Sequence, residues 1–142
     1  PLNFSDTVTY RGMMFTGVPN LVWVFGYFRA SWTLRADLIG DFVCRLLRHM
    51  KSKGASRVMP TLRPEDENMT LGSWVDPENF NPGYLMRGMH LLPKRGSKRE
   101  WQHTQDYWAE KDEFPTIDLD DAVFDYTCEL PEMPGGAKPP LA

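Results

Sequence analysis

A continuous apolar stretch, followed by a glycine and a long amphipathic segment, constrains the fold of this 142-residue chain more than any other feature. Residues 21–25 read Leu-Val-Trp-Val-Phe, and Gly26 ends the run. A β-prone segment that is apolar at every position is typical of a strand covered on both faces. From residue 32 to residue 50, apolar side chains recur every three or four positions, which predicts a helix. A strand, a short turn and a helix form half of a βαβ unit, so the sequence predicts an α/β fold.

The predicted helix has recognisable ends. Ser31 precedes it and is a residue type that caps helix N-termini, and Gly54 follows it, as expected of a C-cap. Its buried face is expected to carry Leu34, Leu38, Ile39, Phe42, Val43, Leu46, Leu47 and Met50. The parallel strands that would pair with residues 21–25 are expected upstream of residue 1, in the preceding portion of the same polypeptide.

The rest of the chain is less regular. We expect short strands at 10–15 and at 57–62, the second at a sheet edge because Pro60 interrupts it. A short helix is expected over 82–92, and a short final element within 117–126. Residues 101–110 form either a further helix or a loop anchored by three aromatic side chains, namely Trp101, Tyr107 and Trp108. The Pro- and Gly-rich residues 129–142 are expected to be disordered.

Composition and charge exclude several classes of protein. No apolar run approaches the roughly 20 residues that span a bilayer, so no membrane span is expected. The two cysteines, Cys44 and Cys128, form no CxxC pair, and idle or buried thiols fit a reducing, cytoplasmic location. Basic residues are not interleaved with exposed aromatic ones, which argues against nucleic-acid binding.

Familiar catalytic and metal-binding motifs are absent from the sequence. It contains no GxGxxG, GxxxxGK[ST], HExxH or GxSxG. The three histidines, His49, His90 and His103, lack metal-ligand spacing, so no metal site is expected. Asp76 and Glu78 lie in an Asp-Pro-Glu-Asn stretch, where turn formation is favoured over a role as an acid–base pair. No catalytic residue is therefore assigned.

The turn of residues 26–33 is the one candidate site. Gly26 would let a planar ligand approach the backbone closely. The free N–H groups of the first helical turn could bond an electronegative edge of that ligand. An ordinary strand-to-helix turn could have the same residues, and the residues alone leave both interpretations open.

Two long runs resemble a known family. The run YRGMMFTGVPNLVWVFGY and the following ASWTLRADLIGDFVCRLL closely resemble the C-terminal part of bacterial FAD-containing, NADPH-dependent monooxygenases of the Baeyer–Villiger type. Within that family they resemble the branch that includes the mycobacterial ethionamide-activating enzymes. The later run PGYLMRGMHLLPKRGSKREW resembles the C-terminal extension of that branch, and together the matches cover roughly residues 8–56 and 80–108.

The resemblance implies a fold, a domain division and a site. Residues 1–54 would be the terminal strand–helix portion of a Rossmann-like FAD-binding domain, and 55–128 an irregular α+β C-terminal extension. The resemblance implies that five residues lie near the flavin, namely Gly26, Ala30, Ser31, Trp32 and Thr33. Three aromatic residues would shape the cavity for a small-molecule substrate, namely Tyr27, Phe28 and Trp32. Such enzymes use NADPH and O₂ to insert oxygen into ketones or to oxidise sulfur or nitrogen compounds.

The family's Gly-rich fingerprints, its signature motif and its catalytic arginine cannot be assigned in this chain. They belong upstream, and neither Arg29 nor Arg35 takes the catalytic role. We therefore expect the chain alone to be inactive and to contact FAD and NADPH mainly through upstream domains. The alternative is a non-catalytic protein-interaction module with residues 21–25 as a docking edge. The coding sequence upstream of Pro1 distinguishes the two.

Overall fold

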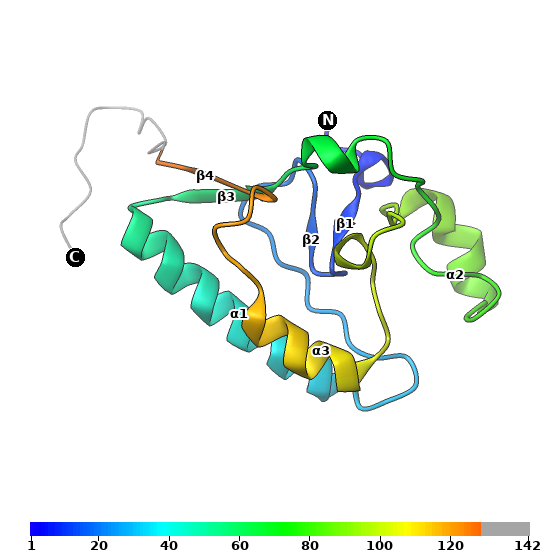
Figure 1. The fold of residues 1–142 in the computed structure, drawn as a ribbon. Coiled ribbons are helices and arrows are strands. Elements are labelled where there is room, and N and C mark those ends of the chain that lie inside the picture. Colours follow the sequence, from blue (N-terminus) through cyan, green and yellow to red (C-terminus); the bar gives the residue numbers. More distant parts are fainter. Residues whose placement is uncertain (129–142) are drawn as a thin grey trace.

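A 22-residue helix, α1 (Trp32–Lys53), runs along one side of the structure, a computed structural model that describes residues 1–128 (Figure 1). Its ends agree with the sequence prediction. Gly54 adopts the left-handed conformation with φ of 66°, and its N–H donates to the carbonyl of Lys51. Ser31 occupies the N-cap position, but its hydroxyl lies 2.9 Å from the hydroxyl of Thr33 and makes no capping bond to the backbone.

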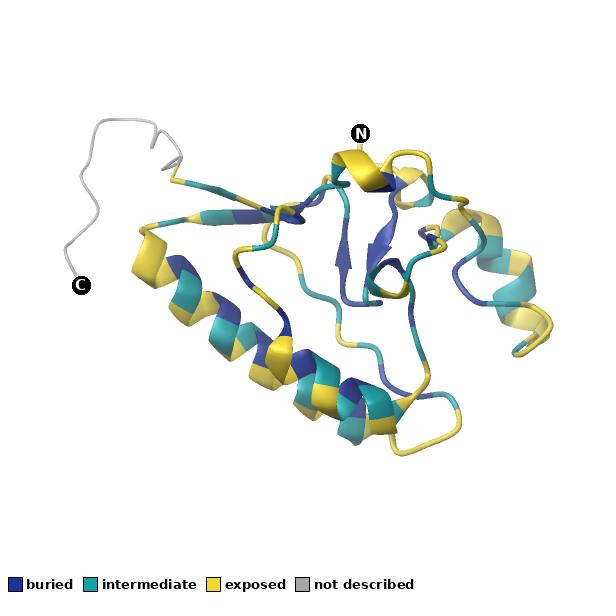
Figure 2. Ribbon diagram, viewed as in Figure 1, coloured by how far each residue is buried: buried dark blue, intermediate teal, exposed yellow. Residues whose placement is uncertain are grey.

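One stripe of α1 is buried against the rest of the molecule (Figure 2). The stripe consists of Arg35, Ile39, Phe42, Leu46 and Met50, which follow one another at helical spacing. The prediction that Leu47 would be buried is wrong, because 58% of this residue is exposed. A helix covered on one side only buries a narrow stripe, and Leu47 lies about 100° around the axis from Leu46. The buried arginine within the stripe was not predicted.

The strands form two small antiparallel sheets. β1 (Thr9–Tyr10) pairs with β2 (Met14–Phe15), and β3 (Arg57–Pro60) pairs with β4 (Phe124–Thr127). The predicted single strand at 10–15 is wrong, since a tight hairpin reverses the chain there through positive φ angles at Arg11 (50°) and Gly12 (72°). The predicted strand at 57–62 is confirmed as β3, and the final element expected within 117–126 is confirmed as β4.

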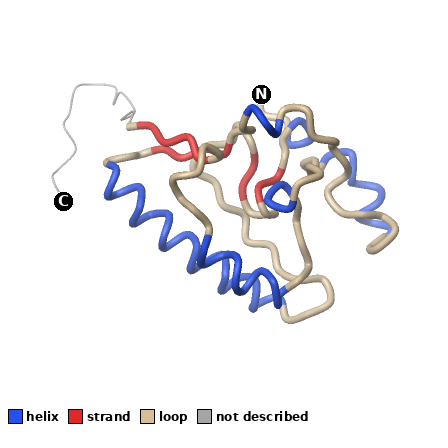
Figure 3. Tube along the Cα trace, viewed as in Figure 1, coloured by secondary structure: helices blue, strands red, loops and turns tan. Residues whose placement is uncertain are grey.

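Residues 21–25, the predicted buried strand, form no strand in this structure (Figure 3). The N–H of Trp23 donates to the carbonyl of Met13 at 2.7 Å, but no ladder follows within the described residues. Leu21 and Val24 are exposed. A strand exists only where neighbouring strands pair with it, so the Rossmann-like portion expected at 1–54 does not appear as a parallel sheet in residues 1–128.

Short helices and turns make up the second half of the described chain. The helix predicted at 82–92 is confirmed as α2 (Gly83–Gly88), which continues into a 3-10 helix (Met89–Leu91). Further 3-10 helices are Phe4–Asp6, Pro64–Asp66, Arg99–Trp101 and Phe114–Thr116. α3 (Tyr107–Glu113) lies beside the N-terminal half of α1 (Figure 1). The predicted tail at 129–142 lies outside the described residues.

The aromatic anchors expected around residue 101 behave differently from one another. Trp101 is fully buried and anchors its loop, as predicted. Trp108 is exposed, so its predicted anchoring role is wrong. It lies on the outer face of the short helix α3, with the ammonium of Lys111 5.8 Å from the centre of its ring.

The apolar interior has two parts. The larger cluster joins α1 to β1, β3 and β4 through residues such as Tyr10, Ile39, Phe42 and Phe124. The smaller cluster contains Phe15, Val18, Trp74 and Val75, with Trp23, Phe28 and Phe80 packed against it. Residues on both sides of the expected boundary at 54/55 therefore share one core. The smaller cluster lies directly beside the turn that leads into α1.

Candidate functional site

The turn of residues 26–33 connects the irregular segment 21–25 to the first turn of α1. Gly26 is buried, and the indole of Trp32 lies against it. A Cβ atom at Gly26 would lie 2.3 Å from Cδ2 of Trp32, which is far closer than two non-bonded carbon atoms can approach. In this structure the absence of a side chain at Gly26 therefore makes room for Trp32.

The start of α1 is open to solvent. Ala30, Ser31, Trp32 and Thr33 are all exposed, with 48% of the surface of Trp32 accessible. The first N–H groups of a helix have no partner within the helix. The side chain of the N-cap residue, Ser31, makes no hydrogen bond to them. These four predicted flavin-facing residues therefore lie together on one accessible surface with backbone donors at the positive end of a helix dipole.

The inner part of the turn is held by residues from the second half of the chain. The hydroxyl of Tyr27 donates to Glu110 Oε2 at 2.6 Å. The N–H of Phe28 donates to Gln105 Oε1 at 2.6 Å. The ring of Phe28 also stacks on the ring of Phe80, with centroids 4.0 Å apart and planes inclined by 8°.

The predicted substrate-facing residues differ in accessibility. Tyr27 is buried and faces Glu110, whereas Phe28 is half-buried and Trp32 is exposed. Burial, and next the hydrogen bond to the Glu110 carboxylate, raise the pKa of Tyr27 far above its usual value. The Tyr27 hydroxyl therefore remains a proton donor to Glu110 at every physiological pH.

A buried ion pair lies directly beneath the turn. Arg35 is 0% exposed and Glu110 1% exposed, and Arg35 Nε lies 3.0 Å from Glu110 Oε2. Two further guanidinium N–H groups of Arg35 donate to the carbonyls of Phe25, at 2.8 Å, and of Arg11. The sequence analysis missed this pair. A single arginine among the apolar positions of α1 was the available signal for Arg35, but no local pattern identified Glu110 as its partner.

His103 occupies an aromatic cluster beside the same turn. Its ring stacks on Trp74 at 5.2 Å and contacts Phe25 and Phe28 edge to face. Burial, with a smaller contribution from the positive charge of Arg35, lowers the pKa of His103 to about 3. The imidazole is therefore neutral at physiological pH. The sequence did not predict that His103 lies beside the turn, because the spacing of the three histidines carries no information about tertiary contacts.

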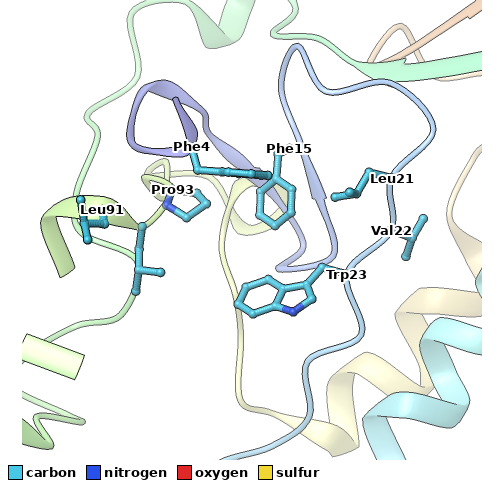
Figure 4. A pocket seen from close by; sticks show the side chains of 8 residues that line it. Phe4, Phe15, Leu21, Val22, Trp23, Leu91 and Pro93 are labelled. Atoms are coloured by element: carbon cyan, nitrogen blue, oxygen red, sulfur yellow. The ribbon is translucent and has the colours of Figure 1, made fainter. Parts of the chain in front are cut away.

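A separate apolar hollow lies beside the hairpin of β1 and β2 (Figure 4). It has a volume of about 340 Å³ and is bordered by Phe4, Phe15, Leu21, Val22, Trp23, Leu91, Leu92 and Pro93. Trp23 and Phe15 form its floor, 5.9 Å apart between ring centres. The hollow has almost no polar group with which to orient a ligand, so it does not compete with the turn as the candidate site.

Within residues 1–128, no cluster of three or more His, Cys, Asp or Glu side chains could hold a metal ion. No helix in the same range is both long and apolar enough to traverse a bilayer. Cys44 and Cys128 are free thiols, and both are exposed rather than buried. Asp76 accepts from the N–H of Glu78 at 3.0 Å, as expected of turn chemistry.

The residues of the turn fit one edge of a flavin. The accessible start of α1 provides backbone N–H donors and a positive helix end, which suit the electronegative edge of an isoalloxazine ring. Exposed small residues, Ala30 and Ser31, leave the approach open. The space at Gly26 is taken by Trp32, so the fit rests on residues 30–33 rather than on Gly26.

Comparison with known proteins finds similar sequences among curated proteins only. No protein-family model matches the chain, and no solved structure matches it. Curated relatives do match, and those reported below are named as FAD-containing or FAD-binding monooxygenases of bacteria. It is 45% identical over 107 residues to the FAD-containing monooxygenase EthA of Mycolicibacterium smegmatis, covering 75% of this chain and 21% of that protein.

Two further relatives extend the match. The putative FAD-containing monooxygenase MymA of Mycobacterium tuberculosis is 38% identical over 120 residues, which is 84% of this chain and 23% of the relative. The probable FAD-binding monooxygenase AlmA of an Acinetobacter species is 33% identical over 127 residues, or 89% of this chain and 24% of the relative. The chain thus spans between a fifth and a quarter of the length of these three relatives.

Proposed function

We propose that this chain is the C-terminal segment of an FAD- and NADPH-dependent monooxygenase that oxidises ketones or sulfur and nitrogen compounds. The observation that carries the proposal is its 45% identity, over three quarters of its length, to an FAD-containing monooxygenase. The accessible start of α1 supports the same conclusion, since it offers the donors that a flavin edge requires. Bound FAD, once reduced by NADPH, would supply the chemistry that activates O₂.

The residues of the turn would have two tasks in that enzyme. The backbone of Ala30, Ser31, Trp32 and Thr33 would bind the flavin edge through N–H donors. The side chains of Phe28 and Trp32 would limit the size of the substrate, because both lie at the accessible side of the turn. Tyr27 would contribute through its backbone and ring, since its hydroxyl is bonded to Glu110.

The phosphate-binding loops and the catalytic arginine would belong to upstream domains. We therefore expect the isolated chain of 142 residues to bind FAD weakly and to show no turnover. Calorimetric titration of the isolated chain with FAD tests this expectation. A site with a submicromolar dissociation constant would contradict the proposal that the main cofactor contacts lie elsewhere.

A non-catalytic interaction module is the second candidate, and the exposed apolar side chains of Leu21 and Val24 favour it. Such a surface suits either a partner protein or the missing sheet of a larger enzyme. The upstream coding sequence separates the candidates. Two GxGxxG fingerprints in the same reading frame are expected of the enzyme, whereas a stop codon or an unrelated domain there would support the module.

A further inference from the structure

Four polar side chains beneath the turn form a buried cluster, here called the Glu110 network, which consists of Tyr27, Arg35, Thr104 and Glu110. Its charged members are almost completely inaccessible, and Tyr27 is only 4% exposed. Buried charges are tolerated only when they are paired and hydrogen-bonded. The network meets this condition. Glu110 accepts from Tyr27 and Arg35 through Oε2 and from the hydroxyl of Thr104 through Oε1.

The network holds the turn on both sides of Gly26. Arg35 donates to the carbonyl of Phe25, the residue before Gly26, at 2.8 Å. Glu110 binds the hydroxyl of Tyr27, the residue after it, at 2.6 Å. The Glu110 carboxylate on α3 therefore acts on both sides of Gly26. It binds Tyr27, 83 positions away, directly, and it binds Arg35, 75 positions away, which in turn binds the Phe25 carbonyl.

Neighbouring contacts continue the same arrangement toward the accessible side. Gln105 accepts the N–H of Phe28, and the carbonyl of Asn79 accepts from the Arg29 guanidinium at 2.6 Å. Residues 27–29 are each bonded to a residue between 79 and 110. Packing alone could fill this volume with apolar side chains, often without loss of stability. The hydrogen bonds of Arg35 to the Phe25 carbonyl and of Glu110 to the Tyr27 hydroxyl are directional, so they also fix the backbone geometry around Gly26.

We infer that Glu110 is a positioning residue, which acts through Tyr27 and Arg35 to fix the turn that presents the start of α1 to the flavin. The inference rests on the proposed function and deepens it, because it makes the segment after residue 54 a determinant of flavin geometry. Small displacements of groups that orient reactants lower reaction rates strongly, by about 100-fold for 1 Å.

The test uses the intact polypeptide that contains this chain and the variant Tyr27→Phe, which removes one hydroxyl and leaves the Arg35–Glu110 pair in place. The matched control is Tyr107→Phe. The Tyr107 ring contacts the Tyr27 ring with centroids 6.0 Å apart, but its hydroxyl is not part of the Glu110 network. Two measurements are made on each variant: amide hydrogen exchange of the peptide covering residues 26–33, and the FAD dissociation constant.

In Tyr27→Phe we expect faster exchange across residues 26–33 and an FAD dissociation constant raised about 3- to 10-fold, with an altered visible flavin spectrum. Tyr107→Phe should change none of these. Wild-type exchange and wild-type FAD affinity in Tyr27→Phe would overturn the inference. Faster exchange with unchanged FAD affinity would also overturn it, because the turn would then be held without consequence for the flavin.

Glu110→Gln extends the test by keeping the shape of the side chain and removing its charge. We expect a larger increase in the FAD dissociation constant than in Tyr27→Phe, and little further effect when the two substitutions are combined. Fully additive effects would contradict a shared network. Failure of the unmodified polypeptide to bind FAD would instead refute the proposed function. The exchange measurement would still show independently whether the network holds the turn.

Discussion

The indole of Trp32 occupies the space that a side chain at Gly26 would need, since a Cβ at Gly26 would lie 2.3 Å from Trp32 Cδ2. The two residues lie near opposite ends of the turn in sequence, but the fold brings them into contact. Each one's role therefore depends on the other: Gly26 allows the indole to fold back over the turn, and the indole covers the backbone at Gly26. Substitutions at the two positions separate packing from flavin contact.

Gly26→Val is expected to displace the Trp32 indole and to lower the free energy of unfolding by about 1–3 kcal/mol, as overpacking does. In the intact enzyme it should also lower flavin occupancy, measured as the flavin-to-protein absorbance ratio. Gly40→Ala is the control, because nothing lies within 4 Å of a Cβ there and alanine is favoured in a helix. Full occupancy with a normal spectrum in Gly26→Val would remove Gly26 from the site.

Trp32→Ala is expected to change substrate preference in the intact enzyme. Because Trp32 is exposed at the accessible side of the turn, its removal should enlarge the substrate cavity. One side chain in a pocket contributes about 1–3 kcal/mol to discrimination, so the ratio of kcat/KM between bulky and small substrates should change roughly 10- to 200-fold. Reduction of the flavin by NADPH should change much less. A lower melting temperature with unchanged substrate ratios would show that Trp32 serves packing alone.

His103 should make the protein less stable as the pH falls. Its folded-state pKa of about 3 lies below its usual value of 6.5, so the unfolded chain binds a proton that the folded chain does not. Between about pH 6.5 and pH 3 its contribution to the free energy of unfolding should fall, by at most about 1.4 kcal/mol per pH unit. Urea titrations across this window measure the slope.

The variant His103→Phe keeps a ring beside Trp74 and should reduce the slope of stability against pH over that window. His90→Gln is the control, because His90 is exposed and does not lie in the aromatic cluster. An equal slope in wild type and His103→Phe would show that His103 is not the group responsible.

Asp66→Asn should be destabilising, by about 1–3 kcal/mol, because it removes a buried charge that accepts hydrogen bonds from two cations. Asp66 is 1% exposed, and its carboxylate accepts from Arg63 Nε at 2.6 Å and from Lys98 Nζ at 2.5 Å. Burial by itself would raise the pKa of Asp66, but the bonds from Arg63 and Lys98 outweigh it and hold the pKa well below its usual range.

The sign of the pH effect follows from that lowered pKa. The stabilisation by Asp66 should be complete above its unfolded pKa of about 3.9 and should be lost as the pH falls toward the lower folded pKa. Asp66→Asn should therefore lose less stability than wild type on acidification below about pH 4. Glu65→Gln serves as the control, since the Glu65 side chain is 62% exposed and its substitution should change stability by less than about 0.5 kcal/mol. Equal stability of Asp66→Asn and Glu65→Gln would refute the prediction.

The sequence was sufficient for features that depend on local interactions. The position of α1, its N-cap position at Ser31 and its left-handed end at Gly54 follow from residues within a few positions of each other. The hairpin at residues 9–15 was missed, because the left-handed conformation of Arg11 is unusual for a residue with a side chain. The Arg35 guanidinium, which belongs to α1, donates a hydrogen bond to the Arg11 carbonyl and helps to hold that turn.

The candidate site shows the same division. The sequence by itself determined that a glycine-containing turn leads into a long helix, because apolar spacing and capping residues act over one or two helical turns. Only the tertiary structure decided that residues 21–25 form no strand. A strand requires a neighbouring strand that pairs with it, and none within residues 1–128 pairs with this segment. Only the tertiary structure brought Glu110 into contact with Arg35 and Tyr27. A buried carboxylate needs hydrogen-bond donors, and these two lie 75 and 83 positions away in the sequence, beyond the reach of any local pattern.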